Sequence, residues 1–174
     1  LMPYPVLPYM SSRGCYWGKC TFCTHSFIYD SHYRKENEVR VAEELDHLSK
    51  KYKTKYFTFS DEAISPNAFN RMSTEILKRG VDMRALGMLK FESSEKESPE
   101  LFDDIYRAGF LMLFFGLESA NDRILSIIDK GCDQETERAV LKHSSEAGIW
   151  NHLYLFFGFP TEERSEAEDT IQFT

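Results

Sequence analysis

The feature that most constrains the fold of this chain is a repeated alternation of extended and helical segments. Two predicted helices begin at the pairs Ser65-Pro66 and Ser98-Pro99, and they end at Gly80 and Gly109. Serine caps the first N–H groups of a helix, proline fits its first turn, and glycine adopts the left-handed conformation that ends it. Strands that alternate with helices in this way form a parallel sheet covered by helices.

Apolar periodicity predicts the other elements. Strands are expected near residues 6–11, 55–60, 83–91, 111–117 and 151–157. Helices are expected near residues 37–52, 65–80, 98–109, 121–129 and 134–147, and from 165 onward. The strands are nearly continuous apolar runs, which predicts that both of their faces are covered, as in a (β/α) barrel.

The number of strands predicts an incomplete barrel. A closed barrel has eight strands and takes about 250 residues, whereas this chain has 174 residues and five predicted strands. We expect one α/β domain over residues 1–174, a partial TIM-like barrel with parallel strands. Because the last helical pattern runs to Thr174, we also expect the barrel to be truncated after its fifth strand and to belong to a larger protein.

Composition narrows the class of protein. Hydrophobic residues make up 42% of the chain and aromatic residues 14%, enough for a substantial core. The net charge of −7 argues against a nucleic-acid partner. The longest apolar runs, 111–117 and 153–159, are far shorter than the roughly 20 residues of a membrane helix. We therefore expect a cytoplasmic protein without a membrane partner.

Three of the four cysteines lie close together, at Cys15, Cys20 and Cys23. If three thiolates bind a 4Fe-4S cluster, one iron stays open to a small molecule. A zinc site with His25 as fourth ligand is the alternative. A disulfide framework is disfavoured, because the trio is odd and the chain has no secretory segment. The distant Cys132 is expected to be a free thiol.

The segment Arg13-Gly14-Cys15-Tyr16-Trp17-Gly18-Lys19-Cys20-Thr21-Phe22-Cys23 resembles the cysteine loop of the radical S-adenosylmethionine (SAM) superfamily. In that superfamily the loop follows the first strand of a partial (β/α) barrel, and an aromatic residue usually precedes the third cysteine. The first gap here holds four residues, one more than usual, and is similar to that of branches related to cobalamin-dependent radical enzymes. The resemblance extends from Pro8 to Glu163, with the cysteine loop at 13–30 and the barrel units at 37–174.

Acidic residues follow the predicted strands, at the barrel face where such folds carry their chemistry. They are Asp61, Glu62, Glu92, Glu118 and Glu162. Caps of the following helices are the alternative reading of each one. Their recurrence on the face that carries the cysteine loop favours a binding site.

The resemblance implies SAM contacts for several positions. Asp61 and Glu62 match the motif that holds the amino group of SAM, and Glu118 with Ser119 matches the segment that contacts the ribose or the methionine end. A further segment matches the part of the fold over which adenine lies: Gly158, Phe159 and Pro160. Phe22 is implied to pack against adenine or to shield the cluster. Arg84 and Lys90 either reach a substrate carboxylate or pair with a neighbouring acid.

The implied function is reductive cleavage of SAM by a 4Fe-4S cluster on Cys15, Cys20 and Cys23, which yields a 5'-deoxyadenosyl radical. The radical would act on an unidentified small-molecule or peptide substrate, with flavodoxin or ferredoxin as reductant, and cobalamin is a further candidate cofactor of the full-length protein. Three alternatives stay open. The chain could be the core of a cobalamin-dependent radical methylase, the core of an RNA methylthiotransferase, or a zinc-stabilised binding module without enzymatic activity.

Overall fold

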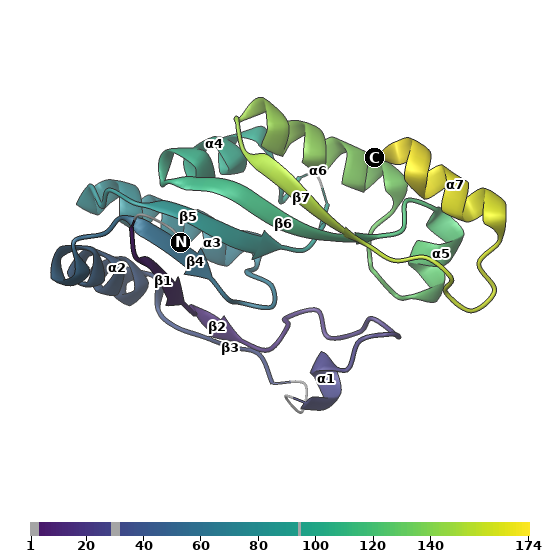
Figure 1. Cartoon of the computed structure of the whole chain (residues 1–174), viewed down its shortest axis with the longest axis horizontal. Helices are drawn as coiled ribbons and strands as arrows, with labels where there is room; N and C mark the ends of the chain where they lie inside the picture. The colour runs from purple at the N-terminus through teal and green to yellow at the C-terminus, as the bar shows by residue number, and fades with distance from the viewer. Residues whose placement is uncertain (1–3, 29–31, 94) are drawn as a thin grey trace.

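A parallel five-stranded sheet forms the centre of the computed structural model, which describes residues 4–28, 32–93 and 95–174. Its strands follow one another in chain order (Figure 1). They are β1 (Val6–Tyr9), β4 (Tyr56–Phe59), β5 (Arg84–Leu89), β6 (Phe110–Glu118) and β7 (Trp150–Leu155). All four neighbouring pairs are parallel. The predicted partial (β/α) barrel is confirmed.

Four helices connect the strands and cover one face of the sheet (Figure 1). They are α2 (Glu38–Tyr52), α3 (Pro66–Arg79), α4 (Pro99–Arg107) and α6 (Gln134–Glu146), which pack side by side in this order. Two more, α5 (Asp122–Ile127) and α7 (Arg164–Phe173), lie beside the carboxyl ends of β6 and β7 (Figure 1). The predicted helices are therefore present, with ends that differ by a few residues.

The serine and glycine residues predicted to begin and end helices do so in the structure. The hydroxyl oxygen of Ser65 accepts a hydrogen bond from the N–H of Ala68, and Ser98 does the same for Leu101. Gly80 ends α3 with φ 65°, in the left-handed region. Gly109 has φ 108°, and a Cβ there would lie 2.2 Å from the carbonyl oxygen of Met83. The close approach of the segments that lead into β5 and β6 thus requires glycine at position 109.

Three small elements were not predicted. An antiparallel pair joins β2 (Ser12–Arg13) to β3 (Arg34–Lys35), and α1 (His25–Ile28) lies between them in the chain. These elements flank the cysteine loop and lie below the sheet in Figure 1. Positions 29 and 30 of the predicted loop 13–30 lie outside the described residues.

The core lies between the sheet and its covering helices. Its largest members are six fully buried phenylalanines, at positions 57, 69, 91, 102, 110 and 115. Each contributes roughly 1.5–3 kcal/mol by leaving water. This core fixes the strand ends that carry the candidate site.

The expectation that both strand faces are covered was wrong for the far edge of the sheet. In β6, Leu113 and Phe115 are fully buried, whereas Phe114 between them is only half-buried. In β7, Trp150 is 71% exposed and Tyr154 is 44% exposed. Helices cover only the outer face, and the concave inner face of an incomplete barrel stays open.

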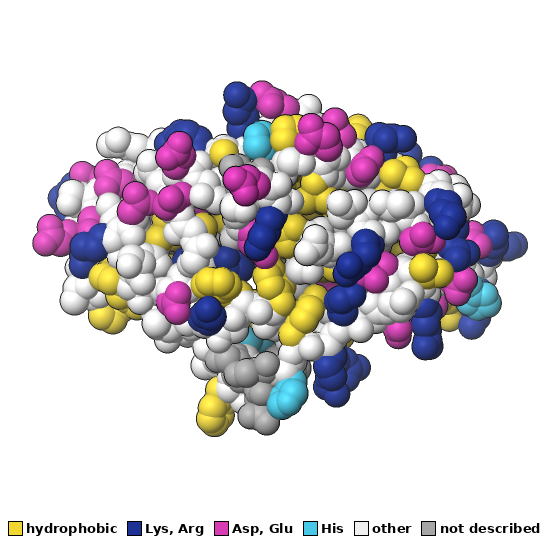
Figure 2. Space-filling view, turned by 180° about the vertical axis from the view of Figure 1, so that it is seen from behind, with side chains coloured by type: hydrophobic (Ala, Val, Ile, Leu, Met, Phe, Trp, Pro, Cys, Tyr) yellow, Lys and Arg dark blue, Asp and Glu magenta, His cyan; other side chains and the backbone are white. Residues whose placement is uncertain are grey.

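The outer surface carries charges of both signs. Figure 2 shows acidic and basic side chains interspersed over the face opposite to the one in Figure 1. Ion pairs such as Arg71–Glu38 and Arg79–Glu43 link neighbouring helices. In the described part of the chain, no helix is long and apolar enough to cross a membrane.

Candidate functional site

A cavity of about 240 Å³ at the carboxyl ends of the strands is lined by all three cysteines of the loop. The carboxylates of Glu62 and Glu118, which follow β4 and end β6, also line it. The remaining lining includes two lysines and three aromatic residues: Lys90, Lys130, Trp17, Phe22 and Tyr154. The topology thus brings thiols, acids and bases from five parts of the chain to one place.

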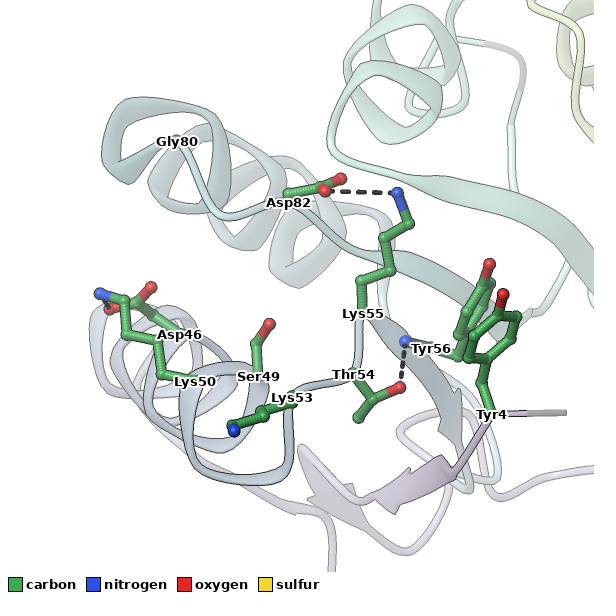
Figure 3. Close-up of a pocket in the computed structure, with 10 residues that line it drawn as sticks. All are labelled: Tyr4, Asp46, Ser49, Lys50, Lys53, Thr54, Lys55, Tyr56, Gly80 and Asp82. Carbon is green, nitrogen blue, oxygen red and sulfur yellow. Dashed lines mark hydrogen bonds and ion pairs between the residues drawn. The ribbon is translucent and has the colours of Figure 1, made fainter.

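A larger hollow of about 730 Å³ opens at the opposite end of the sheet (Figure 3). It lies between the ends of α2 and α3 and the start of β4. Two of its lysines are paired with acids, Lys50 with Asp46 at 2.6 Å and Lys55 with Asp82 at 3.4 Å. Because (β/α) barrels carry their chemistry at the carboxyl ends of their strands, the smaller cavity is the candidate site.

The cysteine loop is docked onto the end of α5. The indole N–H of Trp17 donates to the carbonyl oxygen of Asp129 at 2.8 Å, and the N–H of Thr21 donates to that of Ile128 at 2.9 Å. Gly131 lies directly against the indole ring, since a Cβ there would be 2.2 Å from Cζ2 of Trp17. The loop therefore has a fixed position over the strand ends.

A second contact fixes the start of the loop. The N–H of Gly14 donates to Oε2 of Glu62 at 3.2 Å. Gly14 has φ 83°, and a Cβ there would lie 2.6 Å from the carbonyl oxygen of His32. Glycine is thus required immediately before Cys15, and Glu62 connects the loop to the end of β4.

All four cysteines are free thiols. Across residues 4–28, 32–93 and 95–174, no three His, Cys, Asp or Glu side chains converge closely enough to hold a single metal ion. Cys15, Cys20 and Cys23 instead surround one cavity, which suits a cluster because each of its thiolates binds a different iron. Burial raises the pKa of the Cys20 thiol, and the charges of Lys130 and Lys90 oppose this shift. Three thiols around one cavity, with the unpaired ammonium of Lys90 in its wall, fit an anionic iron–sulfur cluster.

Glu118 is held in a buried ion pair. Lys130, which is 5% exposed, places its Nζ 3.0 Å from Oε1 of Glu118. Glu118 has φ 63° and follows an irregularity in the pairing of β6 with β7. A Cβ on Gly116 would lie 2.5 Å from Oε1 of Glu118 and 2.8 Å from the Lys130 nitrogen. Glycine at position 116 therefore provides the space for this pair.

Two predicted site residues do not line the cavity. Asp61 is 3% exposed, and its carboxylate accepts hydrogen bonds from the hydroxyl groups of Ser11 and Ser12 and from the N–H of Ser11. Ser119 is fully buried, with its hydroxyl 3.2 Å from that of Thr170 in α7. The structure gives both side chains partners that join elements of the fold.

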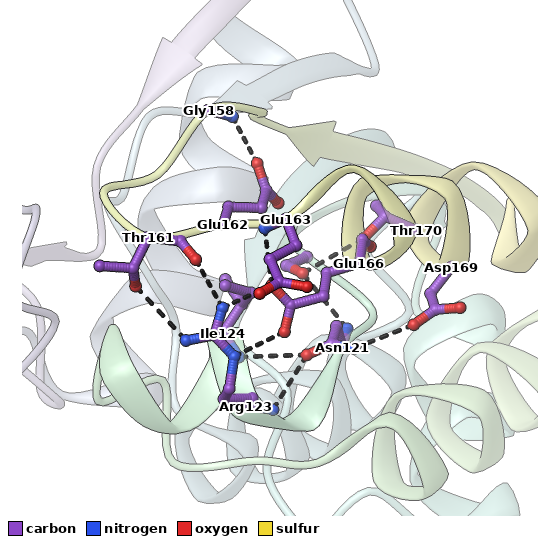
Figure 4. A network of polar contacts seen from close by, with 11 residues as sticks. Asn121, Arg123, Ile124, Gly158, Thr161, Glu162, Glu163, Glu166, Asp169 and Thr170 are labelled. Atoms are coloured by element: carbon purple, nitrogen blue, oxygen red, sulfur yellow. Dashed lines mark hydrogen bonds and ion pairs between the residues drawn. The ribbon is translucent and has the colours of Figure 1, made fainter.

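The predicted adenine segment, Gly158, Phe159 and Pro160, also lies outside the cavity lining. It belongs to a loop that Arg123 connects to α7, donating to the carbonyl oxygen of Thr161 at 2.7 Å and to Glu166 at 2.6 Å (Figure 4). The hydrogen bond from Arg123 lowers the pKa of Glu166 to about 2.

An aromatic chain joins this segment to the site. The ring of Phe159 lies 6.0 Å from that of Phe156, which lies 5.0 Å from that of Phe22. Phe22 itself lines the cavity. The predicted adenine segment thus adjoins the cavity through two aromatic rings.

Sequence reasoning missed Trp17 and Lys130 and left Lys90 undecided. Trp17 lies inside the cysteine motif, so its position was a usable signal, whereas nothing distinguishes Lys130 in the sequence. Arg84 pairs with Asp82 at 3.3 Å, away from the site. Burial lowers the pKa of Lys90, which contacts Trp17 rather than an acid.

These features define a class of protein, partial parallel (β/α) barrels with a three-cysteine loop over the carboxyl ends of their strands. The chain belongs to the Radical SAM superfamily, whose family profile matches residues 9–174. The resemblance of the cysteine motif to this superfamily is thereby confirmed.

Known proteins resemble most of the chain. An uncharacterized methyltransferase of Pyrococcus horikoshii, PH0819, is 29% identical over 99% of this chain and 37% of its own length. The bacteriochlorophyllide d C-12(1)-methyltransferase of Chlorobaculum tepidum is 28% identical over 97% of this chain and 37% of its own length. The chain therefore spans little more than a third of these relatives.

A solved structure shares the fold. The cobalamin-dependent SAM radical enzyme OxsB, with aqua-cobalamin and SAM bound, superposes with a TM-score of 0.81 at 18% identity, over 97% of this chain and 26% of OxsB. This likeness extends the partial-barrel assignment to nearly every residue of the chain.

Proposed function

We propose that this chain binds a 4Fe-4S cluster through Cys15, Cys20 and Cys23, binds SAM beside it, and is the radical SAM core of a larger enzyme. The observation that carries the proposal is the single cavity that collects all three thiols with the carboxylates of Glu62 and Glu118. When bound, the cluster supplies the electron that cleaves SAM into methionine and a 5'-deoxyadenosyl radical.

The residues around the cavity divide the binding work by their chemistry. The three thiols ligate iron. Glu62 suits the ammonium group of SAM, since a carboxylate and an ammonium form a charge-assisted hydrogen bond. The bond from the Gly14 N–H holds this carboxylate beside the loop. Glu118 is aligned by Lys130 and presents an acceptor for ribose hydroxyls.

The lining also has an apolar part. Ala63, Met88 and Leu89 line the same cavity, and Phe22 closes against Phe156 at its rim. A dry cavity strengthens the electrostatic contacts within it and protects a reactive radical from side reactions. Orienting SAM and supplying the apolar floor of the cavity are thus the contributions of this chain to the reaction.

Methyl transfer is the second candidate for the overall reaction, and two observations favour it. Both relatives described above are named methyltransferases. The structural neighbour OxsB is named as cobalamin-dependent. A cobalamin site, the substrate contacts and the docking surface for flavodoxin or ferredoxin would then depend on further residues of a longer protein. An RNA methylthiotransferase core and a zinc-stabilised module are the remaining alternatives.

Metal analysis tests the cluster. Anaerobic reconstitution with iron and sulfide is expected to load about four irons with matching sulfide per chain. Alanine at Cys15, Cys20 or Cys23 should remove most of this iron, and the matched control Cys132→Ala should retain it. Uptake of zinc alone, or equal iron and sulfide in the wild type and Cys20→Ala, would contradict the proposal.

Cleavage of SAM is the second test. Reconstituted protein is incubated with SAM and dithionite, and 5'-deoxyadenosine is followed by chromatography. We expect slow release without added substrate, because orientation of a true substrate supplies much of the rate. Cys20→Ala should release none. Complete absence of the nucleoside from cluster-loaded wild type would show that this chain alone does not cleave SAM.

A further inference from the structure

Lys90 is a buried cation at the wall of the cysteine-lined cavity. Lys90 is 6% exposed and lies directly after β5. The ammonium donates one hydrogen bond, to the carbonyl oxygen of Phe91 at 2.7 Å. No carboxylate of the described residues lies within ion-pair distance of it. Two of its three N–H donors therefore lack a protein acceptor in the described structure.

The second lysine of the cavity differs in this respect. Lys130 is as deeply buried, but its ammonium is neutralised by Glu118 at 3.0 Å. Removing an ammonium from water without a counter-charge is strongly unfavourable. The carboxylate of Glu92 acts on Lys90 only from beyond ion-pair distance, so the ammonium remains available to an anion in the cavity that it lines.

The cysteine loop itself holds Lys90 in place. Its Nζ lies 4.4 Å from the centre of the Trp17 ring, in cation–π contact. Trp17 stands between Cys15 and Cys20 and is fixed by Asp129 and Gly131. The ammonium is therefore attached to the same loop that carries the thiols, and it is among the charges that act on Cys20.

We infer that Lys90 supplies the buried positive charge that faces the thiolate-bound iron–sulfur cluster and raises the reduction potential of that cluster. This inference rests on the proposed function. Reduction adds one negative charge to the cluster, and a nearby cation in a low-dielectric site stabilises the more negative state. Reduction potentials of such clusters respond to local charge and hydrogen bonds. Lys90 influences the reaction only through the charge that it places beside the cluster, and it binds neither iron nor substrate.

The experiment compares Lys90→Met with wild type after anaerobic reconstitution and without SAM. Methionine keeps an unbranched chain of similar length and removes the charge. The reduction potential is measured by redox titration followed by electron paramagnetic resonance, with iron and sulfide counted per chain. We expect about a tenfold lower ratio of reduced to oxidised cluster at a given potential, equivalent to a midpoint about 59 mV more negative.

Two further variants make the result specific. Lys50→Met removes the same charge from an exposed site on α2 at the other end of the sheet, and it should leave the potential unchanged. Lys90→Arg keeps the charge and should recover most of the potential. If Lys90→Met does not load a cluster, Lys90→Gln, which keeps a donor for Phe91, should show the same shift.

Two outcomes would overturn the inference. One is a midpoint potential in Lys90→Met or Lys90→Gln equal to that of the wild type; if SAM binding is weakened at the same time, the SAM carboxylate is the anion that Lys90 meets. The other is an equally large shift of the potential in Lys50→Met, which would make the effect one of overall charge. Failure of the proposed function itself is distinguishable, because then the wild type takes up no iron–sulfur cluster.

Discussion

Adjacent side chains at the end of β4 have different environments. The Asp61 carboxylate is buried against Ser11 and Ser12, where it joins the end of β1 to the end of β4. The neighbouring Glu62 lines the cavity and contacts the loop at Gly14. One acid therefore belongs to the scaffold, and the other is available to a ligand.

Alanine variants of this pair should separate binding from stability. Glu62→Ala is expected to weaken SAM affinity about ten- to a hundredfold, because losing a charge-assisted hydrogen bond costs about 1.5–3 kcal/mol. Asp61→Ala should instead destabilise the fold by about 2 kcal/mol or more, since it leaves buried hydroxyl groups without their acceptor. Calorimetric titration with SAM and thermal unfolding measure the two effects. Unchanged affinity in Glu62→Ala would move the ammonium site elsewhere.

Glu97 is a fully buried carboxyl group. One of its oxygens accepts a hydrogen bond from the N–H of Glu92, and the other has no partner. Burial raises its pKa from the ordinary value of 4.5 to about 8. The folded chain therefore keeps this proton at neutral pH, where the unfolded chain has released it. The stabilisation is complete below the unfolded value and is lost as the pH rises through the folded one.

The stability of the chain should thus fall as the pH rises from about 4.5 to about 8, by up to about 1.4 kcal/mol per pH unit from this group. Glu97→Gln resembles the protonated acid and should reduce the slope. Part of it will remain, because burial also raises the pKa of Glu137, to about 9. Urea unfolding of both proteins across this range measures the slope. Identical slopes would show that Glu97 is ionised in the folded chain.

At the scale of elements, the contact between the cysteine loop and the turn after α5 is sensitive to the addition of a single methyl group. Gly131 has φ 73°, and any Cβ there would overlap the Trp17 ring. Gly80 also has a positive φ, 65°, but no atom lies within 4 Å of its Cβ position. An alanine at either position would have a strained backbone, but only at position 131 would its Cβ also clash with another side chain.

Gly131→Ala is therefore expected to displace Trp17 and to weaken cluster retention, whereas Gly80→Ala should lower stability by about 1 kcal/mol and retain iron. Iron content after reconstitution and a chelator challenge, with thermal unfolding in parallel, measures both effects. Equal iron retention in the two variants would mean that the loop holds its position without Trp17.

The sequence predicts elements well where local chemistry decides them. The pairs Ser65-Pro66 and Ser98-Pro99 begin helices because hydroxyl caps and proline act within one turn. The pair β2 and β3 escaped prediction, since two residues per strand carry no periodicity. The open inner face escaped it too, because residues 153–157 form a continuous apolar run like that of a covered strand.

Site prediction follows the same division. The cysteine spacing identifies the loop, and strand ends identify Glu62 and Glu118 as cavity residues. Asp61 and Ser119 have equivalent sequence positions, and only tertiary hydrogen bonds turn them away from the cavity. Lys130 is brought in by the turn after α5, which no local pattern anticipates. The SAM-binding roles of these residues stay predictions.

At the scale of the whole molecule, the incomplete barrel exposes a free strand edge and large apolar side chains. In the described structure β7 is hydrogen-bonded only to β6, so its outer edge is free. Large apolar side chains on and beyond this strand are exposed, among them Trp150 at 71% and Phe157 at 50%. A free edge beside exposed apolar groups favours pairing with another chain.

We therefore expect this 174-residue chain to associate reversibly as its concentration rises. Trp150→Lys places a charge on the exposed edge strand and should reduce association without affecting the cysteine cavity, which Trp150 does not line. Tyr52→Lys, at a residue 48% exposed at the end of α2, is the matched control and should associate like the wild type. Sedimentation velocity over a range of concentrations measures the effect. A monomeric wild type at every concentration, or equal association of Trp150→Lys and wild type, would show that β7 is not the associating edge.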